Sequence, residues 1–207
     1  MCSCHFVKVY ILNNEAINII KKCDQNGIIT SKSIDEQGFH RSVLQALVAS
    51  GAYYQVCRGI YVRNDEWADE FFILQHKYHR GVFSHTTALY LHGYSDRVPM
   101  SFHMTFPKGY NSLSLKKENV TITRVTDSLY NLGLSETISP SGNKVVTYDI
   151  ERCLCDVLRG KGDDIQITGS AMKKYILSKD CNINKLMHYA KLLRVEPKVR
   201  KYVEVLL

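Results

Sequence analysis

The chain has 207 residues, of which 45% are hydrophobic and 23% are charged, a composition typical of a folded protein and not of a disordered one. This length allows one large or two small domains, and we expect two. The longest apolar runs are far shorter than the roughly 20 residues that a membrane span needs, and the first residues lack a signal-peptide pattern, so we expect a cytoplasmic protein.

The cysteines and the charge distribution narrow the class further. Seven cysteines without a framework spacing predict reduced thiols, and CSCH at positions 2–5 has no partner motif, so we expect neither a metal nor a cofactor.

The formal net charge of the chain is +7. Residues 170–207 contain nine basic and three acidic residues, residues 1–64 contain seven and four, and residues 65–169 contain 11 and 13. Both ends of the chain therefore suit a polyanion, although a solvated helical face would explain the basic C-terminus equally well.

Residues 13–27 predict a first helix, because apolar residues recur at helical spacing after an asparagine cap and before an Asn-Gly stop. A short apolar pair, a second short helix capped by Thr30 or Ser31 and a break at Gly38 follow. Phe39 to Ser50 predict a third helix. We expect that helix to bury Val43, Leu44, Leu47 and Val48. This order of helices is typical of a helix-turn-helix.

A hairpin follows the third helix. Two β-rich runs, Tyr53 to Cys57 and Ile60 to Val62, flank the turn Arg58-Gly59. Three helices followed by a hairpin form a winged helix, so we expect residues 1–64 to be a winged helix-turn-helix DNA-binding domain. In such a domain the third helix can enter the major groove while the hairpin tip contacts the backbone or the minor groove.

The candidate DNA-binding residues carry hydrogen-bond donors or positive charge. The face of the third helix that we expect to be exposed has no carboxylate, and Asp35 and Glu36 in the second helix would have to point away from phosphates. Winged helices also bind proteins, so a protein-interaction role is the alternative. The candidates are Ser31, Lys32, His40, Arg41, Ser42, Gln45, Arg58 and Arg63.

Residues 65–80 predict a linker helix, whose Trp67, Phe71, Phe72 and Leu74 connect the first domain to the remainder. Within residues 81–207 the pattern predicts a helix from Ser84 to His92, strands at 101–106 and 119–125, and two strands around a Pro-Ser-Gly-Asn turn within 131–149. Four helices complete the chain, at Ile150 to Arg159, Ser170 to Ser178, Asn182 to Leu193 and Pro197 to Leu206. The expected fold class is α+β: an N-terminal winged helix-turn-helix, then a mixed domain with a small β-sheet and a C-terminal helical bundle.

Four stretches occur in a characteristic order: GIITSKSIDEQG, VLQALVASGAYYQVCRGIYV, VFSHTTALYLHGYSDRVPMSFHMTFP and, more weakly, TYDIERCLCDVLRG. Together they resemble the AbiEi-like antitoxin of the AbiE abortive-infection family, a type IV toxin-antitoxin system of phage defence. RGIYV and SHTTALYLHG are the most specific pieces. The first ten residues match no motif of that family.

The resemblance implies a winged helix that represses its own operon at inverted repeats in the promoter, and a C-terminal antitoxin domain, residues 81–207, that neutralises the toxin. The toxin of that family is a nucleotidyltransferase-like protein, countered without a stable complex. The implied partners are therefore double-stranded promoter DNA and this toxin. The alternative is a winged-helix transcriptional regulator whose C-terminal domain senses a ligand or partner and is not paired with a toxin.

The histidine-rich segment raises the question of catalysis. His85, His92, Asp96 and His103 are of types that bind metals or transfer protons. However, the chain contains no HExxH, GxSxG, Gly-rich phosphate loop or paired-carboxylate motif. We therefore expect no enzymatic activity and expect His85 to cap or pack its helix.

The last helices carry a basic surface with two alternative uses. It extends the DNA footprint, so that two monomers on an inverted repeat grip the duplex, or it serves the antitoxic role by contacting RNA or the toxin's polyanionic substrate. Its residues are Lys173, Lys174, Lys185, Lys191, Arg194, Lys198 and Lys201.

Overall fold

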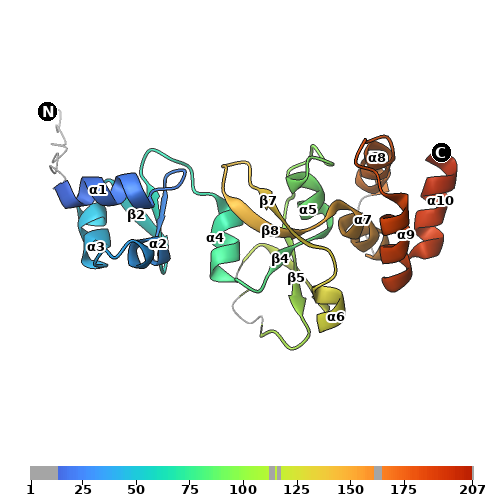
Figure 1. The fold of residues 1–207 in the computed structure, drawn as a ribbon, viewed down its shortest axis with the longest axis horizontal. Helices are drawn as coiled ribbons and strands as arrows, with labels where there is room; N and C mark the ends of the chain where they lie inside the picture. The colour runs from blue at the N-terminus through green and yellow to red at the C-terminus, as the bar shows by residue number, and fades with distance from the viewer. Residues whose placement is uncertain (1–13, 112–114, 116–117, 161–164, 207) are drawn as a thin grey trace, which may run out of the picture. The chain divides into compact units, whose positions relative to one another are not determined.

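The computed structural model describes residues 14–111, 115, 118–160 and 165–206 (Figure 1). The CSCH sequence lies outside the described residues. The chain divides into two compact units: one runs to Lys77 and includes residues 141–143, and the other comprises the remaining residues from Tyr78. The fold class is α+β, as expected: a winged helix-turn-helix precedes a mixed unit with a β-sheet and C-terminal helices.

The N-terminal unit has the element order of a winged helix. Its first elements are α1 (Asn14–Cys23), β1 (Ile28–Thr30), α2 (Ser31–Glu36), α3 (Ser42–Ala49), β2 (Tyr53–Cys57) and β3 (Ile60–Arg63). β3 lies between β1 and β2 and pairs antiparallel with both. Ile19, Ile29, Leu44 and Tyr53 bring the three helices and the sheet into one core.

α3 begins at Ser42, three residues later than we expected, so His40 and Arg41 precede the helix and Arg41 is its N-cap residue. The reason lies in the preceding turn, where Gly38 has a positive φ of 72° and the Phe39 N–H donates to the Ile34 carbonyl. The prediction that Val48 is buried is wrong. Val48 is 38% exposed, because it lies one turn beyond Gln45 on the solvent face.

The expected linker helix is an eight-residue helix, α4 (Glu70–Lys77), and it belongs to the winged-helix unit. Its start follows Asp69, whose carboxylate accepts a hydrogen bond from the Phe72 N–H. Ile73 packs on Ile28 of β1 and on β3. Trp67, which we expected within this helix, lies before it and is exposed.

The C-terminal unit contains a five-stranded sheet in the order β6-β5-β4-β8-β7. The pairs β5–β6 and β4–β8 are parallel, and β4–β5 and β7–β8 are antiparallel. β4 has two residues, too few for the period-two pattern by which the other strands were predicted. The strands are β4 (Val82–Phe83), β5 (Phe102–Pro107), β6 (Val120–Val125), β7 (Leu134–Ile138) and β8 (Lys144–Tyr148).

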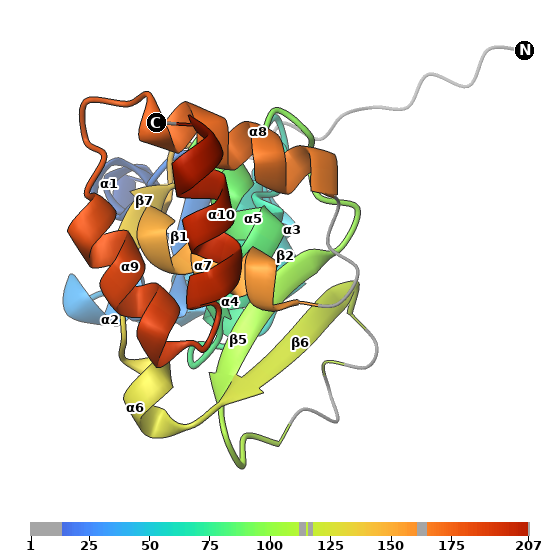
Figure 2. The same ribbon diagram turned by 90° about the vertical axis from the view of Figure 1, so that its right-hand side faces the viewer.

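Helix α7 is the centre of the helical part of this unit. The helices are α5 (His85–Leu91), α6 (Asp127–Tyr130), α7 (Ile150–Arg159), α8 (Ile165–Ile176), α9 (Ile183–Leu192) and α10 (Glu196–Leu206). α7 packs against α5, α8, α9 and α10 (Figure 2), and every residue from Glu151 to Leu158 is buried. α8 begins five residues before the predicted Ser170, because Ala171, Met172 and Tyr175 continue an apolar face that starts further upstream.

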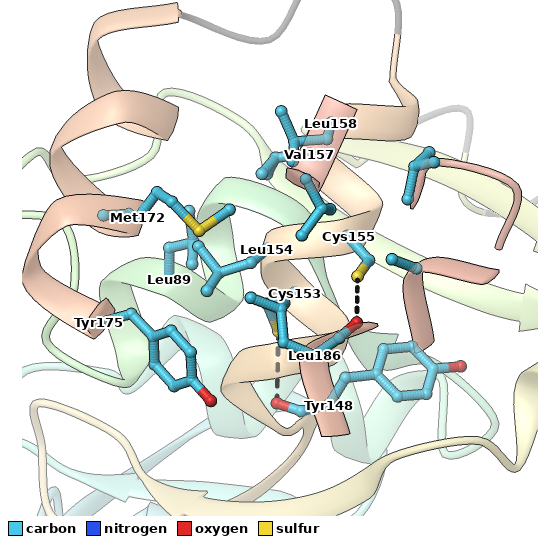
Figure 3. Packing of buried hydrophobic residues seen from close by; sticks show 14 of the residues in the cluster. Leu89, Tyr148, Cys153, Leu154, Cys155, Val157, Leu158, Met172, Tyr175 and Leu186 are labelled. Carbon is cyan, nitrogen blue, oxygen red and sulfur yellow. Dashed lines mark hydrogen bonds between the residues drawn. The ribbon is translucent and has the colours of Figure 1, made fainter. Parts of the chain in front are cut away.

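Cys153 and Cys155 of α7 behave as small buried residues (Figure 3). The Cys153 thiol donates to the Tyr148 carbonyl and the Cys155 thiol to the Leu186 carbonyl, at S–O distances of 3.3 and 3.8 Å. Burial raises the pKa of Cys155 to about 12 and also raises the pKa of Cys153. Both thiols are therefore protonated and unreactive near neutral pH.

A buried ion pair lies within α7, and its arginine also binds the backbone of α6 and of the segment after it. Arg152 is 0% exposed, and its Nε lies 2.9 Å from Oδ2 of Asp156. Its Nη1 donates to the carbonyl oxygens of Leu129 and Leu132, at 2.6 and 3.1 Å, and its guanidinium lies over the Tyr148 ring. Burial raises the pKa of Asp156 to about 6, against the lowering effect of the Arg152 guanidinium.

We predict that Asp156→Ala lowers the free energy of unfolding by about 3 kcal/mol or more, because it leaves the buried Arg152 charge without its counterion. Urea denaturation measures this change. Arg200→Ala is the matched control: it breaks the Arg200–Glu196 pair, which has the same i,i+4 spacing but is largely exposed, and should cost about 0.5 kcal/mol or less. Equal losses in the two variants would contradict the prediction.

Candidate nucleic-acid interface

The exposed face of α3 is the first part of the candidate interface. Val43, Leu44 and Leu47 fix the helix on the core, and this leaves Ser42 and Gln45 exposed. Within the described residues, the Gln45 amide makes no hydrogen bond. An exposed side-chain amide on a helix of this kind can donate one hydrogen bond to a base edge and accept another from it. Adenine is the base that suits this pair of hydrogen bonds best.

His40 is positioned at the start of α3 by the helix itself. Its Nδ1 lies 2.8 Å from the Ser42 hydroxyl oxygen and accepts the Ser42 N–H at 3.3 Å. The ring therefore satisfies one of the free N–H groups at the helix N-terminus. His40 and Ser42 form one polar group at this end of α3.

Arg41 differs from what we expected, because a carboxylate binds it. Its guanidinium forms two hydrogen bonds with Asp35 of α2, one of them from Nε to Oδ1 at 2.9 Å. These bonds lower the pKa of the Asp35 carboxyl. Asp35 thus does not point away from the candidate surface, and its carboxylate competes with a phosphate for the Arg41 guanidinium.

The tip of the wing forms the second part of the candidate interface. Arg58 is exposed and forms no hydrogen bond or ion pair with any described residue. Gly59 has a positive φ of 85°, which the tight turn requires, and its carbonyl accepts the Ser31 N–H at 2.8 Å. The hydrogen bond brings the tip beside the start of α2, where Lys32 is exposed and only loosely paired with Glu36 at 3.6 Å.

Arg63 occupies a structural position and not an open one. Three carboxylates surround its guanidinium: Asp24 at 3.4 Å, Asp65 at 2.6 Å and Glu66 at 2.7 Å. The hydrogen bond to Asp65 raises the pKa of Arg63 above the ordinary arginine value. Arg63 therefore does not belong to the candidate interface, since a phosphate here would meet more negative than positive charge.

Asp24 links the end of α1 to the wing. Its Oδ1 accepts the Gly27 N–H at 2.7 Å, and its Oδ2 accepts the Tyr53 hydroxyl and lies near Arg63. Burial and the contact with Asp24 raise the pKa of Tyr53 well above its usual range, so the hydroxyl remains a donor. This carboxylate therefore adds polar contacts between α1 and the hairpin to those of the shared core.

The basic C-terminal residues do not form one open stripe. Lys185 pairs with Asp149 and Glu151, at 3.1 and 3.0 Å, and Lys198 and Lys174 donate to the carbonyl oxygens of Leu158 and Gly93, both at 2.6 Å. These ammonium groups anchor helices. The remaining residues of the set are exposed and are Lys173, Lys191, Arg194 and Lys201.

His85, His92 and His103 of the C-terminal unit make packing or hydrogen-bond contacts in the structure. The His85 and His103 rings meet edge to face with centroids 5.2 Å apart, and His85 Nδ1 lies 3.0 Å from the Ser84 hydroxyl. His92 Nε2–H donates to the Tyr148 carbonyl at 2.7 Å. No group of three or more histidine, cysteine or acidic side chains in the described part of the chain could hold a metal ion.

Comparison with solved structures supplies structural relatives for this chain. No family model matches the chain, and no curated protein matches it. The chain is similar to the crystal structure of the RV2827C protein from Mycobacterium tuberculosis, with 14% sequence identity, a TM-score of 0.55 and coverage of 93% of this chain and 79% of that one. At this identity the similarity shows the fold. Among the described residues, no helix is both long enough and apolar enough to span a membrane.

We predict that Asp24→Ala lowers the free energy of unfolding by about 2 kcal/mol, because the Tyr53 hydroxyl, the Gly27 N–H and Arg63 all lose a partner. Asp65→Ala removes a carboxylate from the same arginine, but its side chain is 72% exposed, so it should cost about 0.5 kcal/mol or less. Thermal and urea denaturation measure both changes. A loss in Asp65→Ala as large as that in Asp24→Ala would refute the role given to Asp24.

Proposed function

We propose that the protein binds double-stranded DNA through its winged helix and represses its own operon at inverted repeats in the promoter. The observation that carries this proposal is the combination, in one unit, of an exposed Gln45 on α3 and an exposed Arg58 at the wing tip. In this proposal Gln45 reads a base edge in the major groove, and Arg58 anchors the domain to the backbone or the minor groove. Ser31, Lys32, His40 and Ser42 add donors nearby.

The Arg41–Asp35 pair gives this interface a built-in competitor for phosphate. On DNA, a phosphate oxygen competes with the Asp35 carboxylate for the Arg41 guanidinium, and Asp35 stays close to the duplex. This contact gains less affinity than one by an unpaired arginine, because the nearby carboxylate weakens it. In this proposal Arg41 therefore acts more in positioning the protein than in affinity.

The second part of the proposal is that the protein is the antitoxin of a type IV pair, with a nucleotidyltransferase-like toxin as its counterpart. Its support is the sequence resemblance, above all SHTTALYLHG and RGIYV. In the structure these stretches correspond to α5 and to the β2–β3 turn with most of β3. The exposed residues Lys173, Lys191, Arg194 and Lys201 are a proposed extension of the DNA footprint.

A ligand-sensing regulator is the second candidate function, favoured by one observation. A pocket of about 280 Å³ in the C-terminal unit lies between the segment after α5 and helix α8. Its lining includes an aromatic ring, two cations, an amide and one carboxylate, from Tyr94, Arg97, Lys174, Gln166 and Asp96. Such a lining suits a small polar ligand.

We predict specific binding of the purified protein to about 150 base pairs upstream of its own gene. Gln45→Ala should lower the preference for this duplex over a scrambled one by about 1–3 kcal/mol, since a base contact is lost. Arg58→Ala should weaken binding to both duplexes and reduce the slope of log affinity against log salt by about 1. Fluorescence anisotropy at four salt concentrations measures both quantities.

Lys144→Ala is the charge-matched control for Arg58→Ala. Lys144 is exposed on β8 in the C-terminal unit and lies outside the candidate interface. This variant should keep the wild-type salt slope and specificity. If the wild-type protein bound both duplexes equally, or if the Gln45 and Arg58 variants bound like the wild type, the DNA-reading proposal would be wrong.

The antitoxin role predicts that co-expression of this chain restores growth to cells that express the nucleotidyltransferase-like protein encoded beside it. Gln45→Ala and Arg58→Ala should restore growth as well as the wild type, because the resemblance assigns neutralisation to residues 81–207. Colony counts with each gene under its own inducible promoter measure the rescue. Absence of rescue by the folded wild-type protein would refute the antitoxin role and favour the ligand-sensing regulator.

A further inference from the structure

An exposed tryptophan lies beside the base of the wing. Trp67 is the one tryptophan in the chain and is 93% exposed, in the segment between β3 and α4. Leaving an indole ring in water forgoes the large stabilisation that its burial would give. The sequence pattern suggested a packing role for this residue, and the structure gives it none.

Trp67 lines a surface hollow of about 520 Å³ within the N-terminal unit. Tyr54, 38% exposed, supplies a second aromatic ring from β2. The other side chains of the hollow are mostly acidic or amide. They come from Asn64, Asp65, Glu66 and Glu70, with Ala68 between them.

The hollow and the basic wing tip lie at opposite ends of one hairpin. In the β2–β3 register, Tyr53 pairs with Arg63 at the base, whereas Cys57 pairs with Ile60 next to the Arg58-Gly59 turn. Tyr54 and Arg58 are four positions apart in the sequence, which corresponds to roughly 13 Å along an extended strand. One end of the hairpin therefore presents a free cation, and the other presents aromatic rings among carboxylates.

The negative charge at the base of the hairpin excludes a polyanion as the partner and suits a cation. Asp65 and Glu66 share Arg63, so their two negative charges meet one positive charge, and Asp24 adds a third carboxylate to that group. The Glu70 carboxylate forms no ion pair with any residue that the structure describes. Aromatic rings beside uncompensated carboxylates attract a guanidinium or an ammonium group, by cation–π contact and by charge.

We propose that this hollow, lined by Tyr54, Trp67 and Glu70, is a docking surface for an arginine- or lysine-bearing segment of another protein. A lone small cation would leave most of the Trp67 ring in water, whereas a peptide covers the ring with its backbone and neighbouring side chains. The proposal goes beyond DNA binding and does not depend on it, because DNA is assigned to the opposite end of the hairpin. A DNA-bound molecule would thus keep this surface open to a protein.

The test uses the full chain and a fluorescein-labelled eight-residue peptide that alternates glycine and arginine. Because the protein has a net charge of +7, its overall field repels this peptide, so any binding reports a local site. We expect a saturable rise in anisotropy, together with a blue shift of the Trp67 emission when unlabelled peptide is added. The same peptide with glutamate in place of arginine should give neither signal.

Variants identify the site. Trp67→Ala should weaken peptide binding about fivefold or more, and Trp67→Tyr should retain most of the affinity. Glu70→Gln should weaken it about twofold. Glu136→Gln, which removes an exposed carboxylate from β7 in the other unit, is the charge-matched control and should bind like the wild type. All four variants should bind upstream DNA as the wild type does.

Three outcomes would overturn the proposal. The first is no peptide binding at millimolar concentration, and the second is equal binding by Trp67→Ala and the wild type. The third is an emission maximum of the free protein that is already blue-shifted, because the chain itself or a second copy then covers the ring. Sedimentation of the free protein and of Trp67→Ala distinguishes these two occupants. Loss of DNA binding alone would refute the proposed function and leave this inference standing.

Discussion

The carboxylate of Asp24 connects the parts of the winged helix on which its proposed activity depends. It accepts hydrogen bonds from the Gly27 N–H after α1 and from the Tyr53 hydroxyl on β2, and it lies beside Arg63 at the end of β3. The loop that leads to β1, the edge strand β2 and the central strand β3 thus share one carboxylate. β1 pairs with β3, and the Ser31 N–H donates to the Gly59 carbonyl. These contacts hold the wing tip beside α2.

The arginines of this unit illustrate how position decides use. Arg58 stands at a turn with no described partner, Arg41 is bound by one exposed carboxylate, and Arg63 is surrounded by three. The affinity gained by contacting a phosphate falls in this order, because each neighbouring carboxylate offsets the charge of the arginine and repels the phosphate. The hairpin therefore has a basic end and an acidic, aromatic end, and each suits a different kind of partner.

The apolar periodicity and the glycine turns predicted the winged helix, because those signals depend on near neighbours in the chain. The start of α3 was missed by three residues, since the hydrogen bond from Phe39 to Ile34 forms only when the turn at Gly38 closes. The sequence pattern could not predict the ion pairs, because their partners are distant in the chain. Arg63 contacts Asp24 from 39 residues away, and Lys185 contacts Asp149 and Glu151 through tertiary packing of α9 on α7. Trp67 was misplaced because α4 starts after Asp69, so the tryptophan lies outside the helix.

The most direct test of DNA binding by the winged helix is an NMR titration of the ¹⁵N-labelled protein with a duplex from its own upstream region. We predict that the largest amide shifts fall in α3 and at Arg58-Gly59, with the Gln45 side-chain amide among them, while the Trp67 indole N–H keeps its position. Shifts confined to α8, α9 and α10, with α3 and the wing tip unchanged, would contradict DNA binding by the winged helix.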